Sequence, residues 1–304
     1  MLVLQVIRAG VVGVTLLFFF FISDGYPQVR RTIEEGFPGL ATKGLKFALL
    51  SELPKDILLV SGNLTIKESE ITSTIRQSKP VLQTHLKKNT FYVLEDLATK
   101  RLLLREAMTS GRKSGSKEDE IINNFLRSRV HGVSVSDEEL QRFYLENRAL
   151  VGNMVNDQFR ESLREFLKEQ KKEEAKRKYT QNLGRRLKIF VNTGWVKKQS
   201  HPALDNSLDQ ARRSGKPSVI VFGAVGDCPC DMVSPILTTL RKKFANKLNL
   251  LLIQVREEKV LALRYDIQSL PTYLFFNEKG WEVHRHVGFL PEADLENMIT
   301  RTVL

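Results

Sequence analysis

The chain has 304 residues, of which 42% are hydrophobic and 27% are charged. This composition excludes a chain that is disordered throughout, and the length allows two domains that each bury a core. The formal net charge is +12, yet from His201 onward 13 basic residues stand against 12 acidic ones. Nearly all of the excess charge therefore precedes residue 201, which predicts two units with different surfaces.

The basic charge is concentrated on a Lys/Glu-rich stretch, Arg160–Lys188. Acidic residues are interleaved with the basic ones there, and no aromatic stacking pattern accompanies them, which argues against nucleic acid as a partner. Such a surface is equally suited to acidic lipid headgroups or to acidic segments of client polypeptides.

The amino terminus has the pattern of an export signal. Arg8 precedes the uncharged apolar run Ala9–Ile22, whose 14 residues suit a signal-peptide core and fall short of the roughly 20 needed for a transmembrane span. Ser23 and Gly25 are small residues at the −3 and −1 positions of a signal-peptidase site, so cleavage before Tyr26 is one expectation.

A retained membrane anchor is the alternative for the same segment. If Arg8 snorkels to the membrane interface, residues 2–22 reach spanning length. Either alternative exports the chain and makes association with a membrane through the amino terminus an expectation. We therefore expect residues 1–25 to be a signal peptide or membrane anchor, followed by a connector over residues 26–54.

Residues 55–195 are expected to form a mostly helical domain. Residues 57–60 form an apolar run with β-branched residues at both ends, which indicates a strand, and Ser61–Asn63 indicates a turn. Thr65–Glu68 has the pattern of a capping box and predicts the start of a helix. Apolar residues at helical spacing and acidic or polar caps predict further helices over residues 91–107, 117–130, from 136 onward, and 156–187.

Four stretches of this part carry a resemblance: LLVSGNLTIKESEI, VLEDLATKRLLLREA, VSVSDEELQRFYLENR and LGRRLKIFV. Over residues 55–192 the chain resembles the amino-terminal domain of SurA-type periplasmic chaperones. In that family the last helix returns after an inserted parvulin domain, for which there is no room here between Asn147 and Phe159. The resemblance implies a periplasmic protein that binds unfolded or extended exported polypeptides. From the residues alone, a helical spacer that holds the second domain away from a membrane remains an alternative.

Residues 201–304 alternate between strand and helix patterns. Ser218–Phe222 is a continuous apolar run, as expected of a strand buried on both faces. A helical stripe follows from Met232 to Leu240, and the later apolar segments 250–253, 272–276 and 282–287 indicate three more strands, before a closing helix over 294–300. This order predicts a mixed sheet with helices on both faces, so the fold class is α followed by α/β.

Three stretches of this second part, KPSVIVFGAVGDCPCDMVSPIL, YDIQSLPTYLFFNEKG and VGFLPEADLENMI, resemble the thioredoxin superfamily over residues 203–302. The first matches the family's strand, active-site turn and proline-containing helix without a gap. The resemblance implies that Pro271 is cis and packs beside the active cysteines. It also implies that Leu270, Pro271 and Thr272 offer backbone groups to an extended substrate.

The active-site turn departs from the family pattern. Cys230 lies five residues before Pro235, as the second cysteine of the family's Cys-x-x-Cys turn does. The ungapped match then places Asp227 in the position of the nucleophilic cysteine, while Cys228 follows it and Pro229 separates the two cysteines.

Two further departures concern the surroundings of the turn. Val221 stands where thioredoxins often bury an acid for proton transfer, and Gly223 and Gly226 replace the usual tryptophans. These changes argue against a standard dithiol reductase.

Two cysteines in an exported chain indicate a disulfide or a redox pair. A bridge between Cys228 and Cys230 closes a very small loop and stabilises the fold little, while its strain makes it easy to reduce. A position near a helix amino terminus favours the thiolate, whereas Asp227 and Asp231 oppose it. We expect Cys228 to attack first, because it precedes the helix, and Cys230 to resolve.

These features lead to two functional hypotheses. The first is thiol–disulfide exchange of the oxidase or isomerase kind on exported polypeptides, with a membrane redox partner. The second is a non-catalytic periplasmic holdase that uses a degenerate thioredoxin fold for binding. The two hypotheses differ in whether both cysteines cycle.

No metal or cofactor is expected. Two thiolates are too few ligands for a tetrahedral zinc site. His284 and His286 share one face of a strand and are expected at the surface, while His85, His131 and His201 lie in polar surroundings and form no cluster.

Overall fold

The computed structural model describes residues 30–111, 117–146, 156–224, 226 and 230–304. The predicted signal peptide or anchor lies outside the described residues, and so do Asp227, Cys228 and Pro229 of the predicted active-site turn. In the part of the chain that is described, no helix is both long enough and apolar enough to cross a membrane.

The first of two four-stranded sheets belongs to the amino-terminal part and has the order β1-β4-β2-β3. Its strands are β1 (Leu49–Ser51), β2 (Ile57–Ser61), β3 (Leu64–Lys67) and β4 (Phe190–Asn192). β4 pairs parallel with β1 and antiparallel with β2. Because β4 returns to the sheet after a long helical segment, the sheet fixes both ends of that segment.

Some of the helices between β3 and β4 begin at recognisable local signals. Pro80 opens α3, a position in which proline's missing N–H is not needed. The side chain of Asn156 caps α8 by accepting from the Phe159 N–H at 2.8 Å. These helices are α2 (Glu68–Gln77), α3 (Pro80–Lys88), α4 (Thr90–Thr109), α5 (Glu118–Arg129), α6 (Asp137–Glu146), α8 (Asp157–Gln181) and α9 (Leu183–Arg186).

Two sequence predictions for this part are wrong. Thr65 does not start a helix, because Leu64–Lys67 pairs with β2 as the second strand of a hairpin that buries Ile66. The helix starts at Glu68, where the Glu70 carboxylate accepts the Lys67 N–H at 2.9 Å. The long helix predicted to reach residue 187 ends at Gln181, since the chain must turn into the short helix α9 and strand β4.

The segment expected to be a connector is instead part of the amino-terminal core over residues 30–51. It contains α1 (Ile33–Gly36) and β1. Ile33, Leu40 and Leu45 are at most 1% exposed and pack with the helices α4 and α10 (Thr193–Leu204) in one apolar cluster. Apolar residues spaced without a helical or strand period can still be buried when the segment winds over a core, which a periodicity search does not detect.

The second sheet has the order β6-β5-β7-β8. Its strands are β5 (Ser218–Gly223), β6 (Asn249–Gln254), β7 (Thr272–Phe276) and β8 (Glu282–Val287). β6 pairs parallel with β5, while β7 pairs antiparallel with both β5 and β8. The associated helices are α10 (Thr193–Leu204), α11 (Ser207–Arg212), α12 (Cys230–Lys243), α13 (Lys259–Arg264) and α14 (Glu292–Thr302).

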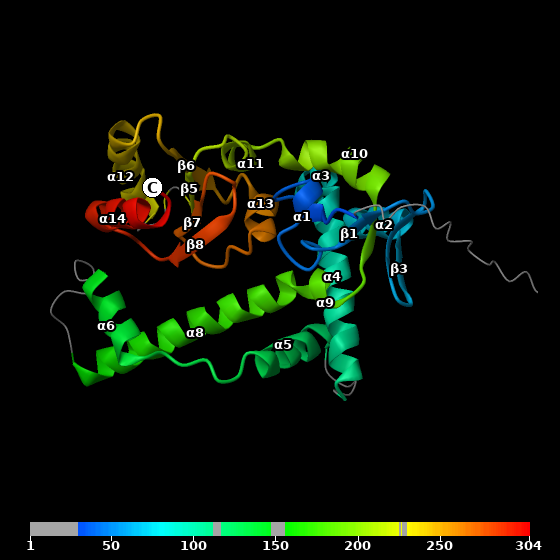
Figure 1. The fold of residues 1–304 in the computed structure, drawn as a ribbon, viewed down its shortest axis with the longest axis horizontal. Helices are drawn as coiled ribbons and strands as arrows, with labels where there is room; N and C mark the ends of the chain where they lie inside the picture. Colours follow the sequence, from blue (N-terminus) through cyan, green and yellow to red (C-terminus); the bar gives the residue numbers. More distant parts are fainter. Residues whose placement is uncertain (1–29, 112–116, 147–155, 225, 227–229) are drawn as a thin grey trace, which may run out of the picture.

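Helices cover both faces of this second sheet, as predicted. On one face Val221 and Tyr273 pack with residues of α12 and α14, and on the other Phe222 and Phe276 pack with residues of α11 and α13. The mixed sheet and the preceding helical part confirm the predicted fold class. Figure 1 shows α12 and α14 at one end of the molecule, and the first sheet at the other.

The helix α10 crosses the predicted boundary between the two parts. Trp195 near its start and Leu204 at its end both belong to the amino-terminal core cluster, which also includes Val260 from α13. The two parts of the chain therefore share apolar contacts, which α10 and α13 make.

Candidate functional site

The predicted active-site turn follows a fully buried strand of the second sheet. All six residues of β5 are buried, and the strand ends at Gly223 between β6 and β7. Gly226 has φ +83°, a left-handed conformation that glycine adopts without a steric cost. Its N–H donates to Asp231 Oδ1 at 3.0 Å, so the turn is tied to the first turn of α12.

The helix α12 begins at Cys230. The backbone N–H groups in the first turn of a helix lack partners within the helix and carry a partial positive charge, which favours a nearby thiolate. Pro235 lies inside α12, as the sequence predicted. The side chain of Cys230 and all of Cys228 lie outside what the structure describes, so the pairing of the two sulfurs stays a prediction.

The cis geometry expected at Pro271 is confirmed. The Leu270–Pro271 peptide bond is cis, and the next residue, Thr272, pairs with Phe222 of β5. This register places Pro271 next to the carboxyl-terminal end of β5, where the predicted active-site turn begins. The Pro271 carbonyl accepts the Gly288 N–H at 2.9 Å, which holds it against the end of β8.

Thr272 is 1% exposed, and its hydroxyl donates to the Ser269 carbonyl at 2.6 Å. The Thr272 side chain therefore makes its hydrogen bond within the protein. Leu270 is half-buried. The expected role of Leu270, Pro271 and Thr272 in holding an extended substrate stays a prediction that concerns their backbone groups.

Beneath the turn, Val221 pairs with Tyr273, which in turn pairs with His286 of β8. The expectation that His286 lies at the surface is wrong: it is 9% exposed, and its ring centroid lies 5.8 Å from that of Tyr273. Burial, helped by the neighbouring His284, lowers the pKa of His286 to about 4. His284 is exposed, as expected.

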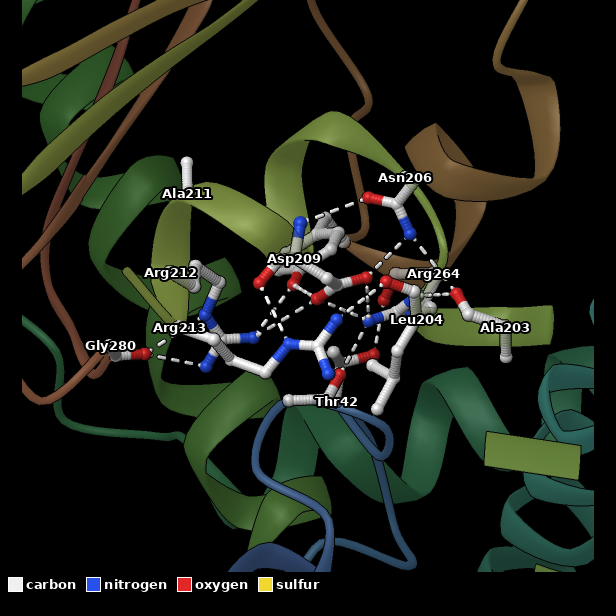
Figure 2. A network of polar contacts seen from close by, with 12 residues as sticks. Thr42, Ala203, Leu204, Asn206, Asp209, Ala211, Arg212, Arg213, Arg264 and Gly280 are labelled. Atoms are coloured by element: carbon white, nitrogen blue, oxygen red, sulfur yellow. Dashed lines mark hydrogen bonds and ion pairs between the residues drawn. The ribbon is translucent and has the colours of Figure 1, made fainter. Parts of the chain in front are cut away.

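A second polar site joins the two parts of the chain, and sequence reasoning missed it (Figure 2). Arg264 Nη2 lies 2.8 and 2.7 Å from Asp209 Oδ1 and Oδ2, and both side chains are 1% exposed. The Arg264 guanidinium also donates to the carbonyls of Gly39 and Ala203 at 2.6 and 3.1 Å. A buried ion pair of this kind joins the amino-terminal loop, α10, α11 and α13.

Arg212 extends the same network. Its guanidinium donates to the Tyr265 hydroxyl at 2.7 Å and to the Gly280 carbonyl at 2.6 and 2.9 Å, and Tyr265 donates to Asp209 at 3.1 Å. Burial raises the pKa of Tyr265 to about 12. Apart from Arg264 Nε, which is buried without a hydrogen-bond partner, the polar side-chain groups of Asp209, Arg212, Arg264 and Tyr265 are engaged within the protein. This indicates a structural site.

The loop at residues 39–45 is held from the other side by Glu95 of α4. Glu95 is 0% exposed and accepts the backbone N–H groups of Thr42, Lys43 and Leu45 at 3.1, 2.8 and 3.3 Å. The Thr42 hydroxyl donates to the Arg264 carbonyl. One loop therefore binds both parts of the chain, and no sequence motif marks it.

Two cavities accompany these features. One of about 30 Å³ lies beside Arg212 and Arg264, room for about one or two waters. The other, about 400 Å³, lies among α2, α3 and α10 and is lined by both polar and apolar residues, including Ile75, Arg76 and Lys87. Within the described ranges, no group of three or more His, Cys, Asp or Glu residues is arranged to hold a metal ion.

Comparison with known proteins finds similarity to thioredoxins. A family model described as Thioredoxin matches residues 197–301. Thioredoxin of Borreliella burgdorferi is 35% identical over 94 residues, which cover 31% of this chain and 80% of that protein. Thioredoxin of Staphylococcus saprophyticus is 31% identical over 97 residues, covering 32% and 91%.

A plant relative, "Thioredoxin Y, chloroplastic" of Oryza sativa subsp. japonica, is 33% identical over 104 residues, which cover 34% of this chain. The match spans 60% of that relative's own length, less than two thirds of it.

Proposed function

Because the chain belongs to the thioredoxin family through its carboxyl-terminal part, we propose that it carries out thiol–disulfide exchange on exported polypeptides. The proposed chemistry belongs to Cys228 and Cys230. The observation that carries the proposal is the geometry around them. α12 begins at Cys230, and the cis Leu270–Pro271 bond lies at the end of the sheet where β5 ends and the turn to α12 begins.

The proposed step is an oxidation of the client by the Cys228–Cys230 disulfide. A client thiolate attacks the Cys228 sulfur, which forms a mixed disulfide and releases the Cys230 thiolate. A second thiolate of the client then attacks the client sulfur that is bonded to Cys228 in the mixed disulfide. This forms the client disulfide and releases the Cys228 thiolate. The client leaves with a new disulfide, and the cysteine pair holds the two electrons, which a membrane redox partner would remove. Isomerisation uses the reduced pair, with Cys228 as the attacking thiolate and Cys230 resolving.

The departures from the family pattern support the oxidising direction. With Asp227 in the nucleophile's position and one residue between the cysteines, the pair closes a strained ring, and strained disulfides are the more oxidising ones. Val221 is 0% exposed and supplies no carboxylate at the place where thioredoxins often bury one.

The amino-terminal part is proposed to hold the client, in keeping with its SurA-like sequence pattern. Its helices expose large apolar side chains that a monomeric enzyme does not need for folding: Val81 is 66% exposed, Leu145 59% and Phe166 45%. A surface with both apolar and charged groups suits extended polypeptides, which expose apolar and charged side chains together. A periplasmic location and attachment by residues 2–22 form part of the same proposal.

The test is oxidative refolding of a reduced, denatured disulfide protein by the full chain, compared with Cys228→Ser and Cys230→Ser. We expect the parent to accelerate formation of native disulfides and each single variant to lose that acceleration. Glu278→Gln on the exposed β7–β8 turn serves as the matched surface control and should behave as the parent. Equal rates for parent and cysteine variants would overturn the redox proposal.

The holdase alternative is favoured by one observation, the aspartate that occupies the nucleophile's position. Suppression of the aggregation of a heat-denatured protein separates the two functions. If the cysteine variants keep this suppression while refolding activity is absent in every form, including the parent, then the protein acts as a binding protein.

A further inference from the structure

The smaller of the two cavities, about 30 Å³, lies at the joint between the two parts of the chain. Gly39 of the amino-terminal loop, Arg212 of α11 and Arg264 of α13 all line it, and Figure 2 shows the polar groups around the two arginines. Arg264 is 1% exposed, and its Nε is buried without a hydrogen-bond partner in the protein. A buried donor that the protein leaves unpaired indicates a bound water or ion beside it.

The buried charges at this joint do not cancel. Arg212 and Arg264 are 7% and 1% exposed, and a guanidinium group stays charged in proteins. They share the carboxylate of Asp209, which lies 3.8 Å from Arg212 Nη1 and 2.7 Å from Arg264 Nη2. The other acceptors of Arg212 are the neutral oxygens of Tyr265 and Gly280. Two buried cations therefore face one buried carboxylate, which leaves one costly positive charge in excess.

The remaining carboxylates near the cavity do not offset this charge. Glu95 is the other buried carboxylate among the described residues, but it does not line the cavity, it accepts three backbone N–H groups of the loop at residues 39–45, and burial raises its pKa. Lys46 lies 3.8 Å from Glu34, and Asp266 is exposed, so solvent screens its charge. The other charges nearby form one cluster of two cations and two carboxylates on α8 and β8: Arg177, Arg285, Glu174 and Glu282.

We propose that this cavity binds one chloride ion, which accepts from Arg264 Nε and balances the excess positive charge of the two arginines. A volume of about 30 Å³ has room for about one or two water-sized species. A halide is a single atom somewhat larger than a water molecule and fits this space, whereas phosphate or sulfate carries four oxygens and does not. A water also satisfies Nε, but it leaves the buried charge unbalanced.

A chloride ion at this joint makes stability depend on the identity of the anion in solution. The lining comes from the amino-terminal loop and from α11 and α13 together, so the unfolded chain has no such site. A ligand that binds only the folded chain stabilises it, and does so increasingly as its concentration rises above the dissociation constant. Ionic strength alone does not have this effect, because a large anion cannot enter the cavity.

The experiment measures thermal unfolding of the full chain at constant ionic strength, while sodium chloride replaces sodium gluconate, whose anion is too large for the cavity. We expect the midpoint to rise by about 2 °C for each tenfold increase in chloride above its dissociation constant, and bromide to act as chloride does. Arg212→Met leaves one buried cation for one carboxylate and should lose the chloride dependence. Lys216→Met is the matched control, since it removes an exposed cation and should keep that dependence.

A direct measurement on the parent chain does not depend on the folding of any variant. In crystals grown with sodium bromide, we expect an anomalous scattering peak within hydrogen-bond distance of Arg264 Nε. Density at that place without an anomalous signal would assign the cavity to water and overturn the proposal. A midpoint that is the same in chloride and in gluconate overturns it too, and so does a chloride dependence that Arg212→Met retains in full.

Discussion

Arg264 and Asp209 form an ion pair in which Nη2 of Arg264 lies 2.8 and 2.7 Å from the two carboxylate oxygens, in a place where both side chains are only 1% exposed. The pair lies between the amino-terminal loop and the second sheet, and Nη1 and Nη2 of Arg264 also donate to the carbonyls of Ala203 and Gly39. Charges are costly to bury unless they are paired and fully hydrogen-bonded. The arrangement therefore depends on both parts of the chain being in place together.

Breaking this pair on one side should be strongly destabilising. We expect Arg264→Met to lower the free energy of unfolding by about 3–5 kcal/mol, because Asp209 would remain buried without its counter-charge. Urea unfolding measures the effect. Lys216→Met, which removes an exposed cation from the same domain, should change the stability by less than about 0.5 kcal/mol. Equal stability of the two variants would contradict the assigned role of the pair.

The close approach of Gly39 to Arg212 gives a second prediction with a matched control. Gly39 and Gly111 both have φ +80°, but a Cβ at Gly39 would lie 2.0 Å from Arg212 Nη1, while one at Gly111 would meet nothing within 4 Å. Gly111→Ala should cost about 1–2 kcal/mol from backbone strain alone. Gly39→Ala should cost about 3 kcal/mol or more, because Arg212 must also leave its buried hydrogen bonds.

Thermal and urea unfolding of these two glycine variants provide the comparison. We expect Gly39→Ala to lower the free energy of unfolding clearly more than Gly111→Ala does. If both alanine variants lose the same stability, Arg212 is free to move and does not hold the loop.

His286 should make stability depend on pH. Its pKa is lowered to about 4 in the folded chain, against roughly 6.5 for an unperturbed histidine. The unfolded chain therefore binds more protons between these values, so stability is fully present above about pH 6.5 and is lost as the pH falls toward 4. A shift of this size corresponds to a loss of about 3 kcal/mol.

Replacement of this histidine isolates its contribution. His286→Phe keeps a ring against Tyr273 and should flatten the part of the pH dependence that lies between pH 6.5 and 4. Val283→Ala, an exposed and non-titrating position on the same strand, should keep the slope of the parent. Urea unfolding of the parent and both variants at several pH values measures how the free energy of unfolding depends on pH. If this dependence is the same in His286→Phe as in the parent, another group is responsible for it.

Asp231 should tune the reactivity of the neighbouring thiol. It accepts the Gly226 N–H at 3.0 Å in the first turn of α12, next in sequence to Cys230. A negative charge at this position opposes formation of a thiolate. We expect Asp231→Asn, which keeps an acceptor for Gly226, to speed the alkylation of Cys230 at neutral pH about threefold to tenfold, in a Cys228→Ser background.

The rate of iodoacetamide labelling across a pH series measures this effect. Glu278→Gln in the same background removes a charge from the exposed β7–β8 turn and should leave the rate unchanged. A slower reaction in Asp231→Asn than in the background protein would mean that the hydrogen bond to Gly226, and not the charge, controls the thiol.

Much of the second sheet could be predicted because its signals are local. The apolar run at β5 was expected, and the start of α8 follows from Asn156 as a cap; both depend on residues that are neighbours in sequence. The cis bond at Pro271 was expected only from the resemblance to the thioredoxin superfamily.

The features that the sequence did not predict depend on contacts between residues that are distant in sequence. The pair of Asp209 with Arg264 joins residues 55 positions apart on two short helices, and neither residue differs in sequence from an ordinary surface charge. Thr65 has the pattern of a helix cap, but pairing of β3 with β2 overrides it. His286 shares a face of β8 with the exposed His284. It is nevertheless buried, because the chain after β8 packs over that end of the strand, where the Leu290 N–H contacts the Tyr273 hydroxyl at 3.4 Å.

The reduction potential of the Cys228–Cys230 pair tests the proposed function most directly. The full chain is equilibrated in graded glutathione buffers, and its thiols are then trapped and counted, with Cys228→Ser and Cys230→Ser as controls. The account predicts a single two-electron transition near or above about −200 mV, among oxidants and isomerases, that both single variants lose. The absence of any disulfide between the two cysteines across the whole range would contradict the redox function.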